Sequence, residues 1–189
     1  MPDFTDLSAG ILASWRTNSR VTAYLIERLP AALWRASIPG EPNRTIRMLA
    51  AHLHNARSRW VRTLGREHGL TPPDLVDRYR VTRRALTAAL KRSSRGIESL
   101  LELGIAAGGQ VPPSRGYVWR NLPLDVEHVL TYFVAHEAHH RGQILLIARQ
   151  LGQRLPAEVV GGLWAWNRRS VEAAGRAGRP VRGAAARIR

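Results

Sequence analysis

Apolar side chains recur every three or four residues through four long segments of this chain, and this spacing limits the fold more than any other feature. No segment has the alternation of apolar and polar residues that predicts a half-buried strand. The spacing predicts long helices over residues 6–29, 45–65, 71–104 and 125–152, and a shorter closing helix over residues 156–174. We therefore expect an all-α fold, an up-and-down four-helix bundle with a short C-terminal helix.

Local signals define the ends of these predicted helices. Thr45 is a suitable N-cap for the second helix, and Gly152 suits the C-terminal end of the fourth. Residues 71–74, with the sequence TPPD, place proline and an acid where the third helix is expected to begin. Residues 104–123 are rich in Gly and Pro, so we expect a long connection there.

The length of 189 residues suits one domain better than two. We expect a single bundle domain over residues 1–174. Residues 175–189 contain Gly, Pro and Arg but few side chains that a core could bury. They are expected to form a basic, disordered tail.

The chain has no cysteine but seven histidines. Disulfides, thiolate catalysis and Cys-based clusters are therefore excluded, and any metal must be held by His, Asp or Glu. No apolar run approaches the roughly 18–20 residues that a membrane span needs, so we expect no membrane partner. The acidic first residues lack the basic and then apolar build of a secretory signal, which predicts a cytoplasmic location.

The formal net charge of +15 raises a second function class, a nucleic-acid-associated protein. Among the 29 basic residues, however, Lys91 is the only lysine, and residues 168–189 carry seven arginines with a single acid. No helix-turn-helix, zinc-finger or RNA-binding signature accompanies the charge. The charge therefore describes the surface of the protein more than a site.

Two histidines of the fourth predicted helix lie on one face. At about 100° per residue, His140 falls inside the apolar stripe and His136 lies beside it. Imidazoles at positions i and i+4 of a helix can share a divalent ion, but they need a third ligand from another helix. His139 turns away from His140 on the wheel and is a reserve candidate.

The second predicted helix offers His52 and His54. His52 lies at the edge of the apolar face, whereas His54 points well away from it. His52 is the better third ligand, and a tri-histidine site would leave a position for water or substrate. The remaining histidines, His54, His68 and His128, are expected to face solvent or to support the ligands.

The segment from Tyr132 to Ile144, which contains the motif HxxxHRGQ, resembles the last bundle helix of the DinB/YfiT-like superfamily of metalloenzymes. The segment from Ala51 to Trp60 is similar to the second-helix motif of that superfamily, in which the first histidine is a ligand. The segment from Gly162 to Trp166 resembles a C-terminal segment of some members. The likeness spans roughly residues 6–172.

This resemblance implies a four-helix bundle that holds a divalent metal through His52, His136 and His140. It also implies a homodimer, which many members form. The few members with assigned activities include thiol transferases that use bacillithiol or mycothiol, and a mycothiol-dependent isomerase. The expected function is a metal-dependent thiol transferase or hydrolase acting on a small molecule, with a low-molecular-weight thiol as partner. A nucleic-acid-associated protein and a metal-stabilised bundle without catalysis are the alternatives.

Zinc and nickel are the expected ions, with iron, manganese or copper as alternatives, because all of them accept imidazole ligands.

Residues near the three histidines also have expected roles. Glu137 faces the apolar side and could orient an imidazole or pair with an arginine of another helix. Gln143 could support a ligand, and Gly142 could permit close helix packing. Four arginines could hold an anionic cofactor, although such residues are more commonly at the surface: Arg57, Arg62, Arg66 and Arg141.

Overall fold

The computed structural model describes residues 4–175, which are mostly helical. The helices are α1 (Phe4–Arg28), α2 (Ala31–Trp34), α3 (Ile46–Trp60), α4 (Arg83–Ala106), α5 (Val126–Gln150), α6 (Ala157–Trp164) and α7 (Trp166–Ala173). A π-helical turn η1 (Val61–Gly65) and a 3-10 turn η2 (Arg66–His68) extend α3, and a hairpin pairs β1 (Ser37–Ile38) with β2 (Glu41–Thr45). The all-α class is confirmed, although the sequence pattern did not predict the small hairpin.

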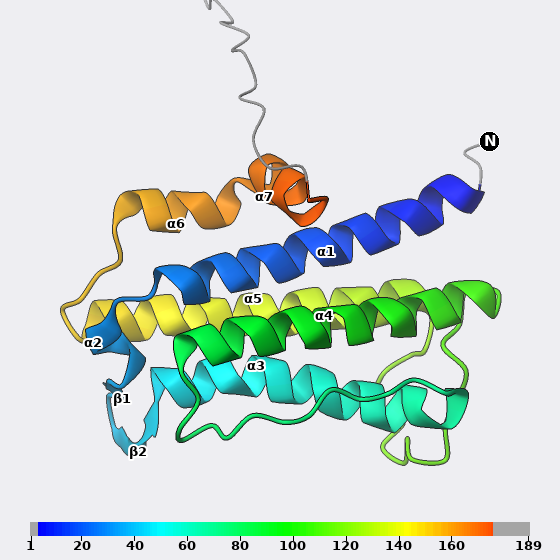
Figure 1. The fold of residues 1–189 in the computed structure, drawn as a ribbon, viewed down its shortest axis with the longest axis horizontal. Helices are drawn as coiled ribbons and strands as arrows, with labels where there is room; N and C mark the ends of the chain where they lie inside the picture. Colours follow the sequence, from blue (N-terminus) through cyan, green and yellow to red (C-terminus); the bar gives the residue numbers. More distant parts are fainter. Residues whose placement is uncertain (1–3, 176–189) are drawn as a thin grey trace, which may run out of the picture.

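The four long helices α1, α3, α4 and α5 pack along one another, as Figure 1 illustrates. Helix α1 packs on α4 and α5, and α3 packs on the same two helices. Helices α6 and α7 lie along the outer side of α1. Within the described residues, no helix is long and apolar enough to cross a membrane. Of the predicted tail, residues 175–189, all but the first residue lie outside the described part of the chain.

The helix directions alternate only in part. Figure 1 shows α1 and α5 running one way and α3 and α4 running the other way. The two parallel helices, α3 and α4, are joined by residues 69–82, which return along the length of α3. We call residues 69–82 the return segment. The alternation expected of an up-and-down bundle is therefore broken at this crossing.

The predicted start of the third helix, at residues 71–74, is wrong. Helix α4 begins at Arg83, where the side chain of Thr82 accepts a hydrogen bond from the backbone N–H of Ala85. The return segment is held in an extended path by side chains of α3. Asn55 both donates to the carbonyl of Val76, at 3.1 Å, and accepts from its N–H, at 2.9 Å. Two prolines also disfavour a helix in this stretch.

The other predicted helix ends are close to the observed ones. Thr45 caps α3 by accepting from the N–H of Met48, and Gly152 follows α5 with a φ of 70°, which favours glycine. The single closing helix expected over residues 156–174 is wrong, because the chain breaks at Ala165 into α6 and α7. The break accompanies the packing of both short helices on α1, where the Arg169 guanidinium lies 4.0 Å from the ring centroid of Tyr24.

Buried apolar side chains form two clusters with a polar layer between them. The first cluster includes Leu25, Leu53 and Ile144, and the second includes Trp15 and Phe133. On α1, α3 and α5, a group of buried polar residues lies near the point in the sequence where the residues of one cluster are followed by those of the other. We call this group the polar layer; it consists of Asn18, Thr22, Arg57, Glu137 and Arg141.

Candidate metal centre

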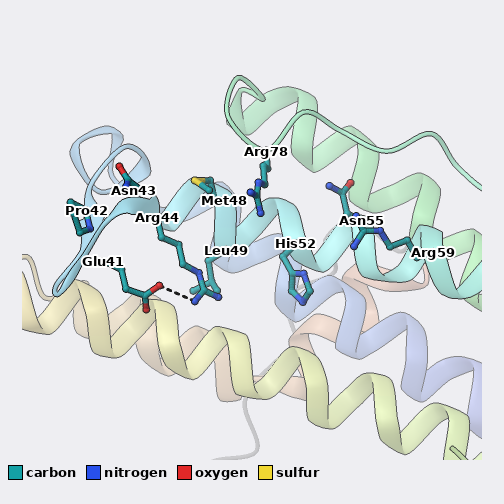
Figure 2. A pocket seen from close by; sticks show the side chains of 10 residues that line it. All are labelled: Glu41, Pro42, Asn43, Arg44, Met48, Leu49, His52, Asn55, Arg59 and Arg78. Carbon is teal, nitrogen blue, oxygen red and sulfur yellow. Dashed lines mark hydrogen bonds and ion pairs between the residues drawn. The ribbon is translucent and has the colours of Figure 1, made fainter. Parts of the chain in front are cut away.

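Three histidines from two helices bring their ring nitrogens together. His52 of α3 points toward α5, as Figure 2 shows, and meets His136 and His140. The Nε2 atom of His136 lies 3.2 Å from Nε2 of His52 and 3.2 Å from Nε2 of His140. One ligand atom from each of the three residues lies within 4.8 Å of the others. These are the three residues that the sequence predicts as metal ligands.

The spacing of the nitrogens fits a divalent ion. Two nitrogens bound to one tetrahedral zinc, each at about 2.0–2.1 Å, lie about 3.3 Å apart. Both separations from His136 are close to that value. His140 is buried, whereas His52 and His136 each keep part of their surface accessible. The cluster could therefore hold a divalent metal ion that remains reachable from one side.

The surroundings favour neutral imidazoles, the form that binds metals. Burial is the main reason that the pKa of His136 falls to about 4, and the neighbouring His140 and His52 lower it further. Burial also lowers the pKa of His52 and of His140 below the ordinary value. The guanidinium of Arg44 contributes to both of these decreases in pKa, and Arg59 contributes to that of His52.

A second contact fixes the tautomer of His140. Its Nδ1 lies 2.7 Å from Oε1 of Gln143, one helical turn further along α5. Because the amide oxygen only accepts, Nδ1 carries the proton and the Nε2 lone pair is free to face an ion. Gln143 therefore contacts a candidate ligand, and its support of a metal site stays a prediction.

The other histidines lie outside the cluster. His139 is exposed on α5, with its ring 5.1 Å from that of His140, and is not among the three grouped residues. His128 is also exposed and lies 3.2 Å from a carboxylate oxygen of Asp125. His54 is fully buried, contrary to its predicted outward direction, because the return segment covers that face of α3. Its Nε2 lies 2.8 Å from the carbonyl oxygen of Asp74.

Glu137 follows the candidate ligand His136 in the sequence, but among the described residues its carboxylate forms no hydrogen bond with the three imidazoles. Its side chain is fully buried and pairs with Arg57 of α3, with 2.6 Å between Oε1 and Nε. Thr22 donates to Oε2 at 2.6 Å and Asn18 at 3.0 Å. Of the two roles considered for Glu137, the structure supports the pairing with an arginine of another helix.

Two arginines expected at the surface belong to this polar layer. The side chain of Arg57 is 1% exposed, and Arg141 is buried and donates to both Asn18 and Thr22. Arg57 follows His52 on α3, whereas Glu137 and Arg141 each directly follow a histidine on α5. The polar layer therefore ties together the two helices that carry the candidate ligands.

The family model described as DinB family matches residues 1–162 of the 189-residue chain. The chain belongs to the DinB family. The resemblance seen in the sequence is thus confirmed, and His52, His136 and His140 all lie within the matched residues of this DinB chain. No curated protein and no solved structure gives a significant match.

The histidine cluster of the DinB chain borders a pocket of about 370 Å³, to which His52 contributes. The pocket lies between the hairpin, α3 and the return segment (Figure 2). It is lined by Glu41, Pro42, Asn43, Arg44, Met48, Leu49, His52, Asn55, Arg59 and Arg78. Sequence reasoning missed these arginines, because their meeting depends on the return segment and the hairpin, neither of which the apolar spacing predicts.

Gly142 does not serve close packing in this DinB chain, because a Cβ atom added there would meet nothing within 4 Å. That expectation is wrong. Such a contact occurs instead at Gly162 of α6, where an added Cβ would lie 2.4 Å from the hydroxyl oxygen of Tyr24. Glycine is therefore required at residue 162 for α6 to approach α1.

Replacing Gln143 with alanine is expected to weaken metal binding about 10- to 100-fold, because His140 loses the acceptor that fixes its tautomer. A competition titration against a chelator of known affinity measures this change. Gln150→Ala, an exposed substitution on the same helix, is the control and should leave the affinity unchanged. Equal affinities for the wild type and Gln143→Ala would show that the contact does not support the ligand.

The lowered pKa values predict a loss of stability in acid for the metal-free protein. Below pH about 6.5 the unfolded chain takes up protons on these histidines, whereas folded His136 resists protonation until its pKa of about 4. The unfolded state thus binds more protons in this window, and stability falls as the pH is lowered through it. Urea unfolding at several pH values, with chelator present, should show a weaker pH dependence in His136→Asn. The same slope in both proteins would contradict the assignment.

Proposed function

We propose that the chain is a metal-dependent enzyme in which His52, His136 and His140 hold one divalent ion, zinc or nickel before iron or manganese. The observation that carries this proposal is the convergence of three Nε2 atoms beside an open pocket. Neutral imidazoles suit all of these metals. A bound ion of this kind supplies Lewis-acid chemistry, which lowers the pKa of a water or thiol.

The reaction class that we propose is transfer or hydrolysis dependent on a low-molecular-weight thiol. The chain itself has no cysteine, so a reacting thiol must arrive with the substrate or cofactor. His52 lines the pocket and would present the ligand cluster to a molecule bound there. Gln143 holds His140 in position, and the polar layer holds α3 against α5.

The test combines elemental analysis with a thiol-transfer assay on the same full-length preparation, purified without chelators. We expect about one divalent ion per chain and consumption of a small thiol in the presence of an electrophilic acceptor such as monochlorobimane. Chelator-treated protein is the control. Absence of a bound ion would contradict the metal centre, whereas a bound ion without turnover would leave a metal-stabilised bundle.

We also propose that the four long helices form the bundle core of one domain over residues 1–174, and that this domain forms a homodimer in the cytoplasm. The packing of α1 and α3 against both α4 and α5 supports the bundle. Sedimentation equilibrium of the purified chain tests the dimer, since a monomer over the whole concentration range would contradict it.

A further inference from the structure

The pocket beside His52 carries more positive than negative charge. Arginines reach it from three different elements: Arg44 from β2, Arg59 from α3 and Arg78 from the return segment. Its one acidic residue is Glu41, whose carboxylate lies 3.2 Å from Arg44, as the dashed line in Figure 2 shows. Glu41 thus offsets one of the three arginines.

The other two arginines have no acidic partner among the described residues. Within the described part of the chain, no carboxylate lies within 4.0 Å of Arg59 or Arg78. The guanidinium of Arg78, which lines the pocket, lies 4.8 Å from the centroid of the Tyr79 ring and donates from Nη2 to the Tyr79 hydroxyl, an uncharged partner. Guanidinium groups without acidic partners in a concave site favour carboxylates or phosphates, which they can bind with two hydrogen bonds.

The scaffold around these arginines is fixed. Both polar atoms of the Asn55 amide are used on the backbone of Val76, so this residue anchors the return segment to α3. Arg78 follows Val76 by two residues, and Arg59 follows Asn55 by one helical turn. The anchor therefore joins the backbone segments that carry Arg59 and Arg78 before any ligand binds, which reduces the entropic cost of binding.

We propose that this pocket binds a small molecule through a carboxylate or phosphate group held by Arg59 and Arg78, with the rest of the molecule directed toward His52. This inference rests on the proposed metal centre, because it names the substrate class of that centre. The volume of about 370 Å³ lies at the lower end of the range for small-molecule sites, about 300–1,000 Å³. Met48 and Leu49 give the pocket an apolar wall for the body of such a molecule.

The experiment is isothermal titration of metal-free, full-length protein with inorganic phosphate and, separately, with succinate. Saturable binding of at least one anion is expected, and the comparison tells which of the two groups is preferred. Arg59→Gln and Arg78→Gln should each weaken it about tenfold, the effect of losing a hydrogen bond between charged groups. Thermal unfolding of each variant verifies that the fold is intact.

Matched controls separate the pocket from the general charge of the protein. Arg80→Gln and Arg84→Gln remove the same charge from exposed positions outside the pocket and should change the affinity less than about twofold. Glu41→Gln should strengthen anion binding, because it frees Arg44. The proposal requires that anion affinity increases in Glu41→Gln and decreases in both Arg59→Gln and Arg78→Gln.

Three results would overturn the proposal. The first is no saturable binding of either anion, and the second is an equal loss of anion affinity in the pocket variants and the control variants. The third is that Arg59 and Arg78 are needed to bind duplex DNA but not to bind either anion. The last result would assign the arginines to a nucleic-acid surface. Elemental analysis of the same preparation, made before its metal is removed for the titration, distinguishes the two proposals. A chain that is purified with metal but binds neither anion contradicts the pocket alone, and anion binding by a chain that takes up no metal contradicts the metal centre alone.

Discussion

Replacing Glu137 with alanine is expected to lower the free energy of unfolding by about 3–5 kcal/mol, the cost of breaking a buried ion pair by removing one partner. Glu137 and Arg57 are each about 1% exposed, with 2.6 Å between the paired atoms. Without the carboxylate, Arg57 stays buried and uncompensated, and the hydrogen bonds from Thr22 and Asn18 lose their acceptor. Urea unfolding of the purified proteins measures the change.

The control for this prediction is Glu102→Ala, which removes an exposed carboxylate from α4 and should change stability within about 0.5 kcal/mol. A second check combines Glu137→Ala with Arg57→Met. The double variant should be less destabilised than the sum of the single variants, because both substitutions break the same pair. A loss below about 1 kcal/mol for Glu137→Ala would mean that the polar layer does not hold the helices together.

Replacing His136 with alanine is expected to abolish stoichiometric metal binding. Its Nε2 atom lies between those of His52 and His140, at 3.2 Å from each, so its loss leaves two ligands on different helices. Two imidazoles leave a divalent ion under-coordinated. Elemental analysis after dialysis should find about one ion per chain in the wild type and a small fraction of that in the variant.

His139→Ala is the matched control, since this exposed histidine lies on the same helix and near His140 but outside the cluster. It should retain the ion. If His139→Ala loses the ion and His136→Ala keeps it, the ligand set is wrong. Circular dichroism of both variants verifies that the helices remain.

The histidine cluster was predictable from the sequence because each of its three residues lies on a helix whose direction the apolar spacing defines. One hundred degrees per residue places His136 and His140 on the same side of α5, and the same rule selects His52 on α3. The rule also predicted that Glu137 faces inward. It could not name Arg57 as the partner, because the two residues are 80 positions apart and meet only through helix packing.

Apolar spacing did not predict the conformation of the return segment. The apolar spacing assigns residues 71–82 to a helix, yet backbone groups of Asp74 and Val76 are bound by side chains of α3, His54 and Asn55. Side chains of another element replace the hydrogen bonds that a helix would supply, and no local pattern signals this. The same crossing explains why the outward direction predicted for His54 is wrong and why Arg78 reaches the pocket.

X-ray absorption spectroscopy of the zinc-loaded, full-length chain tests the central claim most directly, because it reports the atoms bound to the ion. We expect three imidazole nitrogens at about 2.0–2.1 Å and one further light ligand. The imidazole signal should disappear in His136→Ala. A zinc ion bound mainly through carboxylate oxygens, or an imidazole signal that persists unchanged in His136→Ala, would contradict a centre formed by His52, His136 and His140.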